Sequence, residues 1–187
     1  MSLELKSTPA QLPAGVRLRA LGVADVPAVL QIQAQCYGAQ YVEGEGVFTR
    51  RLLAPHHCSW ATEHAGRLVA YLAAYWSAPG KITPLQGDFA AVPVPSVLYL
   101  HDMAVAPAAA GQGLAGALLD AVRAQALARG GITQMALVAV QDAHHYWARK
   151  GFVRCRPADV QAQQHLASYG PDACYMAQPL QPLVTNL

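Results

Sequence analysis

A glycine-rich segment in the second half of the chain has the residue types of an anion-binding turn. Residues 103–119 read MAVAPAAAGQGLAGALL, in which an apolar stretch ends, a proline turns the chain and glycines precede a helical pattern. Glycine and alanine at 111, 113, 115 and 116 lack bulky side chains, so backbone amides there can approach a ligand closely. Amides at a helix start lack intrahelical partners and favour negative charge, which suits a pyrophosphate. Tight packing of a helix on a strand explains the same glycines, so this segment alone leaves both interpretations open.

A histidine precedes this segment by a few residues. His101 lies in the apolar run 97–105, which has the length of a buried strand. Because alternate residues of a strand share a face, we expect His101 on the same face as Met103. Histidine titrates close to neutral pH and can take a proton from a nucleophile. The alternative is a core histidine held by a hydrogen bond, or one that orients Asp102.

A histidine-rich stretch superficially suggests a metal site. His56, His57 and Cys58 are consecutive, and His64 follows nearby. Zinc ligands must converge on one point, whereas this set straddles the start of a predicted strand. We expect a solvated turn here and no metal ion.

Two pairs of charged residues precede or end a predicted helix. Arg50 and Arg51 either face an acidic group of a substrate or cap the C-terminal end of that helix. Glu43 and Glu45 either attract a cationic amine or are charges at the helix N-terminus.

Hydrophobic periodicity places these residues in a single mixed α/β domain. Helical spacing or helix-start signals occur at 25–37, 45–53, 113–129 and 142–150. Strand patterns occur at 15–21, 58–63, 67–76, 97–105, 132–140, 152–156 and 174–179. We therefore expect a central mixed sheet of about six or seven strands with about four helices. The domain spans 15–178, with an N-terminal tail at 1–14 and a C-terminal tail at 179–187.

Residues 77–96 match neither a helix nor a strand. This segment contains Pro79, Pro84, Pro93 and Pro95. An irregular segment of this length is uncommon inside a domain, and it is either a surface insertion or a lid on the substrate side.

Composition excludes several classes of protein. The 187 residues are 53% hydrophobic and 13% charged, with a net charge of +2, which excludes intrinsic disorder and disfavours nucleic-acid binding. The longest apolar run, 68–76, is far shorter than the roughly 20 residues that span a membrane. The first residues do not form a secretion signal, and the four cysteines form no C-x-x-C motif. We expect a soluble cytoplasmic protein that binds neither nucleic acid nor membrane.

Two motifs together resemble the GNAT N-acetyltransferases. L-x-x-M-A-V-x-P followed by G-Q-G-L-A-G-A-L-L resembles the acetyl-CoA motif of that family, and VAVQDAHHYWARKGF resembles its second motif. The motifs cover 98–119 and 137–152, and the order of predicted elements extends the resemblance to roughly 15–178. The combination is most similar to a bacterial branch of the family whose substrates are commonly unassigned.

The resemblance implies a reaction and a set of cofactor-binding residues. It implies transfer of an acetyl group from acetyl-CoA to a primary amine of a small molecule by direct attack. Backbone groups of the strand would hold the pantetheine arm, and the glycine turn would hold the phosphates. The implied cofactor-binding residues are Met103, Ala104, Val105, Gly111, Gln112, Gly113, Leu114, Ala115, Gly116 and Gln141.

The resemblance also bears on the catalytic residues. An alkylammonium must lose a proton before it can attack, and in arylalkylamine N-acetyltransferases a histidine at the position of His101 is tied to this step. Tyr146 is the nearest candidate to protonate the departing thiolate. Trp147 occupies the position of the family's usual tyrosine, which favours a structural role for Tyr146.

The chain departs from the family pattern at two further positions. Ala110 stands where the family often has Gln or Arg, so the phosphates would rely on backbone amides or on Arg149 or Lys150. Val140 stands where an asparagine often ends the fifth strand, with Gln141 beside it.

Two rival functions fit the same motifs. One is a protein or peptide Nα-acetyltransferase, for which 77–96 would form one wall of a groove. The other is an acyl-CoA sensor without catalytic activity. Dimers are common in the family, so a homodimer is among the expected partners, and the sequence does not identify the acceptor amine.

Overall fold

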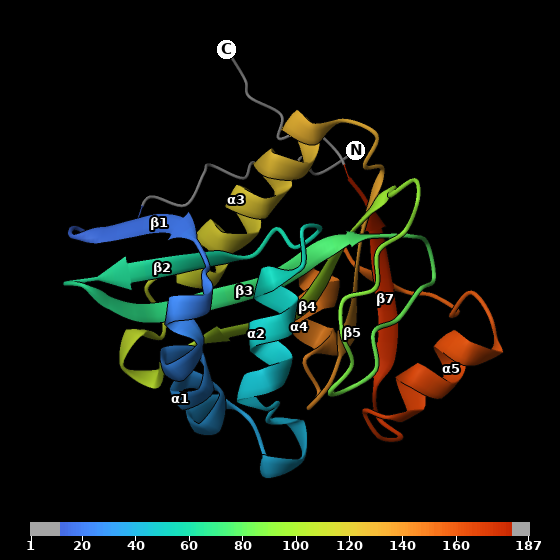
Figure 1. Ribbon diagram of the computed structural model, residues 1–187, viewed down its shortest axis with the longest axis horizontal. Helices are drawn as coiled ribbons and strands as arrows, with labels where there is room; N and C mark the ends of the chain where they lie inside the picture. The colour runs from blue at the N-terminus through green and yellow to red at the C-terminus, as the bar shows by residue number, and fades with distance from the viewer. Residues whose placement is uncertain (1–11, 181–187) are drawn as a thin grey trace, which may run out of the picture.

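A seven-stranded mixed sheet forms the centre of the molecule (Figure 1). The computed structural model describes residues 12–180. The strands are β1 (Val16–Ala20), β2 (Trp60–His64), β3 (Arg67–Ser77), β4 (Val97–Val105), β5 (Gln134–Ala139), β6 (Val153–Arg154) and β7 (Cys174–Pro179). Their order across the sheet is β1-β2-β3-β4-β5-β7-β6. Only β4 and β5 pair in parallel among these described strands, which confirms the expected mixed sheet.

Helices cover both faces of the sheet. They are α1 (Val26–Cys36), α2 (Glu45–Leu53), α3 (Leu114–Arg129), α4 (His144–Arg149) and α5 (Val160–Ala167). One core cluster joins the sheet to α1, α2, α5 and the segment 78–96, and the other joins it to α3 and α4. Within residues 12–180, no helix combines the length and the apolar character needed to cross a membrane.

Most predicted elements are confirmed. α2 and β7 have the predicted bounds, whereas α5 was not predicted. Its signal is Asp159, whose side chain accepts a hydrogen bond from the Ala162 amide at 2.8 Å and starts the helix. Asp25 lies at the start of α1 without capping it through its side chain, because its carboxylate pairs with Arg19 and accepts from the Gly22 amide.

The irregular segment 78–96 packs as a wall on one face of the sheet, between α2 and α5 (Figure 1). Ile82 and Phe89 are buried, and the Phe89 ring stacks on Tyr75 with centroids 4.3 Å apart. The Tyr169 hydroxyl donates to the Thr83 carbonyl at 2.7 Å, which ties the wall to the chain after α5. These contacts anchor the part of the segment from Ile82 to Phe89 in the core.

A β-bulge in β4 changes which residues share a face. Ala74 pairs with Leu100 and Ala73 with Asp102, so His101 is an extra residue without a partner in β3. Met103 packs in the cluster with α3, whereas His101 contacts Glu43 and Phe89 on the opposite face. The prediction that His101 and Met103 share a face is therefore wrong, because the bulge interrupts the two-residue alternation.

The pairing of the parallel strands β4 and β5 ends immediately before the bulge. Their register ends at Leu100 opposite Leu137, while β4 continues to Val105 and β5 continues alongside β7. The last residues of β4 therefore have one edge that no neighbouring strand occupies. We call this opening the wedge. It is bounded on one side by residues 101–105 of β4 and on the other by residues 138–141, which form the end of β5 and the start of the turn after it.

Candidate functional site

A cavity of about 230 Å³ lies at the wedge. β4 contributes His101, Asp102 and Met103 to its lining, and β5 contributes Leu137 and Val138. The remaining lining residues come from helix ends, loops and strand interiors: Tyr37, Tyr41, Glu43, Leu72, Leu85, Leu100, Val140, Gln141, Ala143, Tyr146, Trp147 and Tyr169. Groups from both sides of the sheet therefore meet at one opening.

A buried ion network connects α2 to the bulge. The Arg51 side chain is 0% exposed and donates through both terminal nitrogens to the two carboxylate oxygens of Glu43, which is 3% exposed. Glu43 Oε2 lies 3.0 Å from Nε2 of His101, whose side chain is 2% exposed. The three side chains form a continuous line from the helix to the cavity.

Electrostatics in this network favour an ionised Glu43. Burial alone raises the pKa of Glu43, but the charges and hydrogen bonds of His101 and Arg51 outweigh it and lower the pKa well below the usual range. An ionised carboxylate can only accept hydrogen bonds, so Nε2 of His101 must be the donor. The neutral form of His101 therefore has its lone pair on Nδ1.

The second ring nitrogen of His101 has no hydrogen-bond partner. Nδ1 is buried, and nothing among the described residues bonds to it. The ring lies edge-on to Phe89 and Tyr169, with centroids 5.4 Å and 6.5 Å away. His101 lines the cavity, so this unpaired nitrogen is a polar atom whose hydrogen bonding a ligand or a water molecule would complete.

Asp102 forms a separate buried unit beside His101. Its carboxyl receives Tyr71 Oη at 2.6 Å and Gln33 Nε2 at 3.1 Å on Oδ2, while Tyr37 Oη lies 2.6 Å from Oδ1. Tyr37 Oη also lies 2.8 Å from the Met103 carbonyl oxygen. A hydroxyl has one proton, so both Tyr37 contacts are full hydrogen bonds only if Asp102 is protonated and donates to Tyr37.

Burial favours the neutral form of Asp102. Burial raises the pKa of Asp102, and the hydrogen bonds of Tyr37 and Tyr71 and the charge of His101 offset this only in part. His101 and Asp102 thus differ in their surroundings. His101 is paired with the charged Glu43, while the side-chain partners of Asp102 are neutral.

The open edge of β4 offers backbone groups to the wedge. The Ala106 amide bonds to Val69 on the β3 side, so strand alternation turns the amides and carbonyls of Met103 and Val105 away from β3. The Met103 carbonyl is met by Tyr37 and the Val105 carbonyl by Cys36 Sγ at 3.2 Å. The two amides remain as donors along the wedge.

The glycine turn leads into α3 in a conformation that only glycine adopts easily. Gly111 and Gly113 have φ of +75° and +77°, and no atom lies within 4 Å of where a Cβ would be. Gly113 is the N-cap of α3, a helix of 16 residues. The first amides of α3 lack intrahelical acceptors, so their N–H groups are free to bind an anion at the positive end of the helix. We call this set of amides the phosphate cradle.

The predicted site residues fall into two groups. His101, Met103, Gln141 and Tyr146 line the cavity. The other predicted cofactor residues lie outside its lining, at the end of β4 or in the glycine turn and first turn of α3: Ala104, Val105, Gly111, Gln112, Gly113, Leu114, Ala115 and Gly116. Gln141 has a left-handed φ of +51°, an unusual conformation of the kind often found at functional sites.

Tyr146 and Trp147 both reach the cavity although they are consecutive. Trp147 is buried and packs edge-on against Phe152, with centroids 5.2 Å apart. Tyr146 is half-buried, and its ring lies at 81° to that of Trp147. Burial raises the pKa of Tyr146, and Arg149 offsets this in part.

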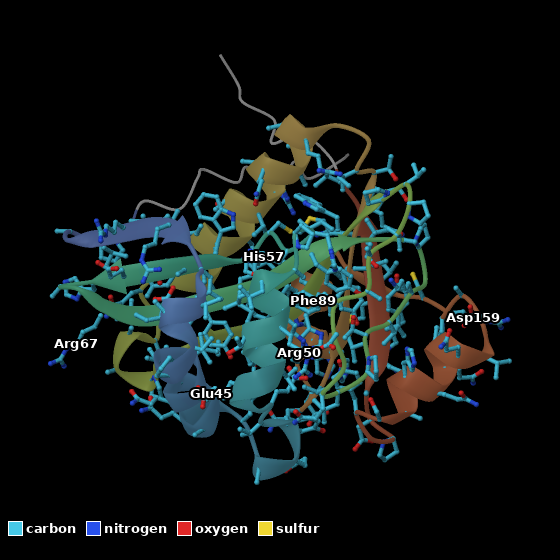
Figure 2. The ribbon with its side chains drawn as sticks, in the orientation of Figure 1. Glu45, Arg50, His57, Arg67, Phe89 and Asp159 are labelled. Carbon is cyan, nitrogen blue, oxygen red and sulfur yellow. The ribbon has the colours of Figure 1, made fainter. Side chains whose placement is uncertain are left out.

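The two arginines of α2 lie in different environments. Arg51 is fully buried and paired with Glu43, while Arg50 is exposed and pairs with Asp88 at 2.9 Å on the wall segment. Figure 2 shows Arg50 on α2 and Glu45 at the start of the same helix. Within residues 12–180, no three or more His, Cys, Asp or Glu side chains are grouped closely enough to hold a metal ion.

Sequence reasoning did not identify the partners of the two polar groups at the bulge. Gln33, Tyr37 and Tyr71 come from α1 and β3, and they meet Asp102 across 69, 65 and 31 residues of chain. In the sequence, these three residues are visible only as polar side chains within largely apolar segments. Only the folded sheet brings them to one point.

Comparison with known proteins places the chain among acetyltransferase folds. A family model described as "Acetyltransferase (GNAT) family" matches residues 26–152. None of the curated protein sequences compared with the chain matches it significantly.

Solved structures show the same fold at low sequence identity. The ribosomal-protein-S18-alanine N-acetyltransferase from Escherichia coli has a TM-score of 0.62 at 18% identity, covering 92% of this chain and 98% of that one. The loading GNATL domain of CurA from Lyngbya majuscula has a TM-score of 0.66 at 12% identity, with coverages of 89% and 98%. N-acetylglutamate synthase from Neisseria gonorrhoeae, complexed with coenzyme A and N-acetyl-glutamate, has a TM-score of 0.61 at 16% identity, covering 91% of this chain and 36% of that one.

Replacing Asp102 with asparagine tests its protonation state. An aspartate whose pKa is raised by folding contributes stability that is fully present below its unfolded pKa and is lost as pH rises through its folded pKa. Asparagine has no proton to lose and can supply the same donor to Tyr37. We expect Asp102→Asn to gain stability relative to the wild type as pH rises, measured by thermal melting between about pH 4 and about pH 8. A melting difference that stays constant over this range would contradict a protonated Asp102.

Proposed function

Because the chain belongs to the GNAT family of acetyltransferases, we propose that it transfers an acetyl group from acetyl-CoA to a primary amine of a small molecule. The observation that carries the proposal is the cavity at the wedge, where the ion-paired His101 lies beside the open edge of β4. Acetyl-CoA brings an activated acyl group, and the protein must supply a site for it and a base for the amine.

The residues of the wedge and the glycine turn fit acetyl-CoA. The space beside Gly111 and Gly113 is open, so anionic phosphates can approach the amides at the start of α3. The amides of Met103 and Val105 suit the polar groups of a pantetheine arm. Gln112, Leu114, Ala115 and Gly116 complete the cradle through their backbone, and Gln141 lies on the opposite side of the cavity.

His101 is the proposed general base. An alkylammonium with a pKa of about 10.4 holds its proton at neutral pH, so attack of the amine on the thioester requires a group that removes this proton. Nδ1 of His101 takes this proton, directly or through one water, and Glu43 stabilises the imidazolium that forms. The amine nitrogen then bonds to the acyl carbon, the carbon–sulfur bond breaks, and the thiolate leaves with the electron pair. Tyr146, which lines the cavity, is the proposed donor of a proton to that thiolate.

The wall segment favours a small acceptor over a peptide. Leu85 of this segment lines the cavity together with Tyr41 and Tyr169. The segment is held by hydrogen bonds to both flanking elements, including the Leu85 amide to Ser168 Oγ at 3.0 Å. A fixed wall over the acceptor side suits a compact amine, and the buried His101–Glu43 pair favours an enzyme over a silent sensor.

Replacing His101 tests the base. His101→Gln keeps a polar side chain of similar size but removes the titrating nitrogen, so we expect kcat to fall by roughly 100-fold or more. The assay follows thiol release from acetyl-CoA over a panel of primary amines. His64→Gln, in the exposed end of β2, is the control and should keep wild-type activity. Equal loss in both variants, or full activity in His101→Gln, would remove His101 from the reaction.

Substitution in the glycine turn tests the phosphate cradle. Gly113→Ala places a side chain at φ +77° and disturbs the first turn of α3, so we expect the KM for acetyl-CoA to rise roughly tenfold. Gly130→Ala, at the other end of α3 with φ +72° and equally open surroundings, introduces similar strain far from the cradle. A similar KM in the two variants would place the phosphates elsewhere.

A further inference from the structure

Arg51 is fixed more firmly than any role in helix capping requires. Its guanidinium is fully buried and donates to Glu43 through both terminal nitrogens and to the Gly87 carbonyl through Nε and Nη2, at 2.9 Å and 2.5 Å. The group also lies 5.0 Å from the ring centroid of Phe89. A lysine has a single ammonium and cannot make this set of planar contacts.

Glu43 is held from a second direction by the wall segment. The Gln86 amide donates to Glu43 Oε1 at 2.7 Å, and Gln86 Nε2 donates to the Val42 carbonyl at 2.9 Å. Gln86 has a left-handed φ of +64°, which is unusual outside glycine. The carboxylate is thus fixed by α2 on one side and by the turn at 84–87 on the other.

We propose that Arg51 is a positioning residue for the acetyl-transfer reaction, acting with the turn at 84–87 through Glu43 on His101. This inference rests on the proposed function. Arg51 and Gln86 fix both oxygens of Glu43, so that Oε2 faces Nε2 of His101. The carboxylate then holds the ring in the tautomer that leaves the Nδ1 lone pair free.

The proposal gives the wall segment a part in the chemistry. The Gly87 carbonyl is the only acceptor outside Glu43 that the described hydrogen bonds give to Arg51. A Cβ at Gly87 would lie 2.6 Å from Pro84 Cγ, so glycine lets the turn close tightly under the guanidinium. A displaced turn would therefore loosen Arg51, and through it Glu43, although Gly87 itself does not line the cavity.

Two variants and one matched control test the chain of contacts. Arg51→Lys keeps the charge and loses the planar fork, and Gly87→Ala shifts the turn through its contact with Pro84. We expect each to lower kcat roughly tenfold while the KM for acetyl-CoA stays within about twofold. Arg50→Lys changes the neighbouring arginine of α2, whose partner is the exposed Asp88, and should keep the wild-type kcat.

A readout independent of catalysis separates positioning from general damage. In ¹⁵N-labelled protein, two-bond ¹H–¹⁵N spectra report which ring nitrogen of each of the seven histidines carries the proton, and His101→Gln identifies the relevant signals. Neutral His101 should carry its proton on Nε2 in the wild type and in Arg50→Lys. Arg51→Lys and Gly87→Ala should show a mixture of tautomers, measured in folded protein below its melting temperature.

The outcomes distinguish this inference from the proposed function. An unchanged tautomer and unchanged kcat in both Arg51→Lys and Gly87→Ala would overturn it, as would a wild-type ring protonated on Nδ1. If no amine is acetylated by the wild type but the tautomer responds to Arg51→Lys, acetyl transfer fails while the control of Arg51 over His101 is supported.

Discussion

The extra residue in β4 determines how His101 and Asp102 face the site. Because His101 has no partner in β3, the alternation of the strand resets, and both His101 and Asp102 face the α1–α2 side. The pairing of β4 with β5 ends at Leu100, immediately before the bulge. One local irregularity therefore supplies an open backbone edge and two adjacent polar side chains at the same point of the sheet.

Burying charges beside this bulge costs solvation, and the fold offsets that cost with dense hydrogen bonding. Arg51 and Glu43 are almost fully removed from water, and each makes contacts to the wall segment in addition to their mutual pair. A buried ion pair of this kind contributes little net stability compared with apolar residues, but loss of one partner is strongly destabilising. Such an arrangement is better explained by the need to orient a neighbouring group than by stability.

The sequence predicted the sheet, the glycine turn and the helix after it well, because those depend on local patterns. The apolar run of β4 and the glycines before α3 carry short-range signals, and the resemblance of two motifs to the GNAT family is confirmed. The face of His101 was predicted wrongly, since no residue in 97–105 marks the bulge. The partners of Glu43 and Asp102 come from distant parts of the chain, and they depend on packing that periodicity does not encode.

The functional account depends on the binding of acetyl-CoA in the wedge, and amide hydrogen exchange with and without acetyl-CoA tests this binding most directly. The account predicts added protection at the amides of Met103 and Val105 and across 111–116, with β1 and β2 unchanged. Protection confined to other parts of the sheet, or no protection at saturating acetyl-CoA, would contradict a cofactor bound between β4 and β5.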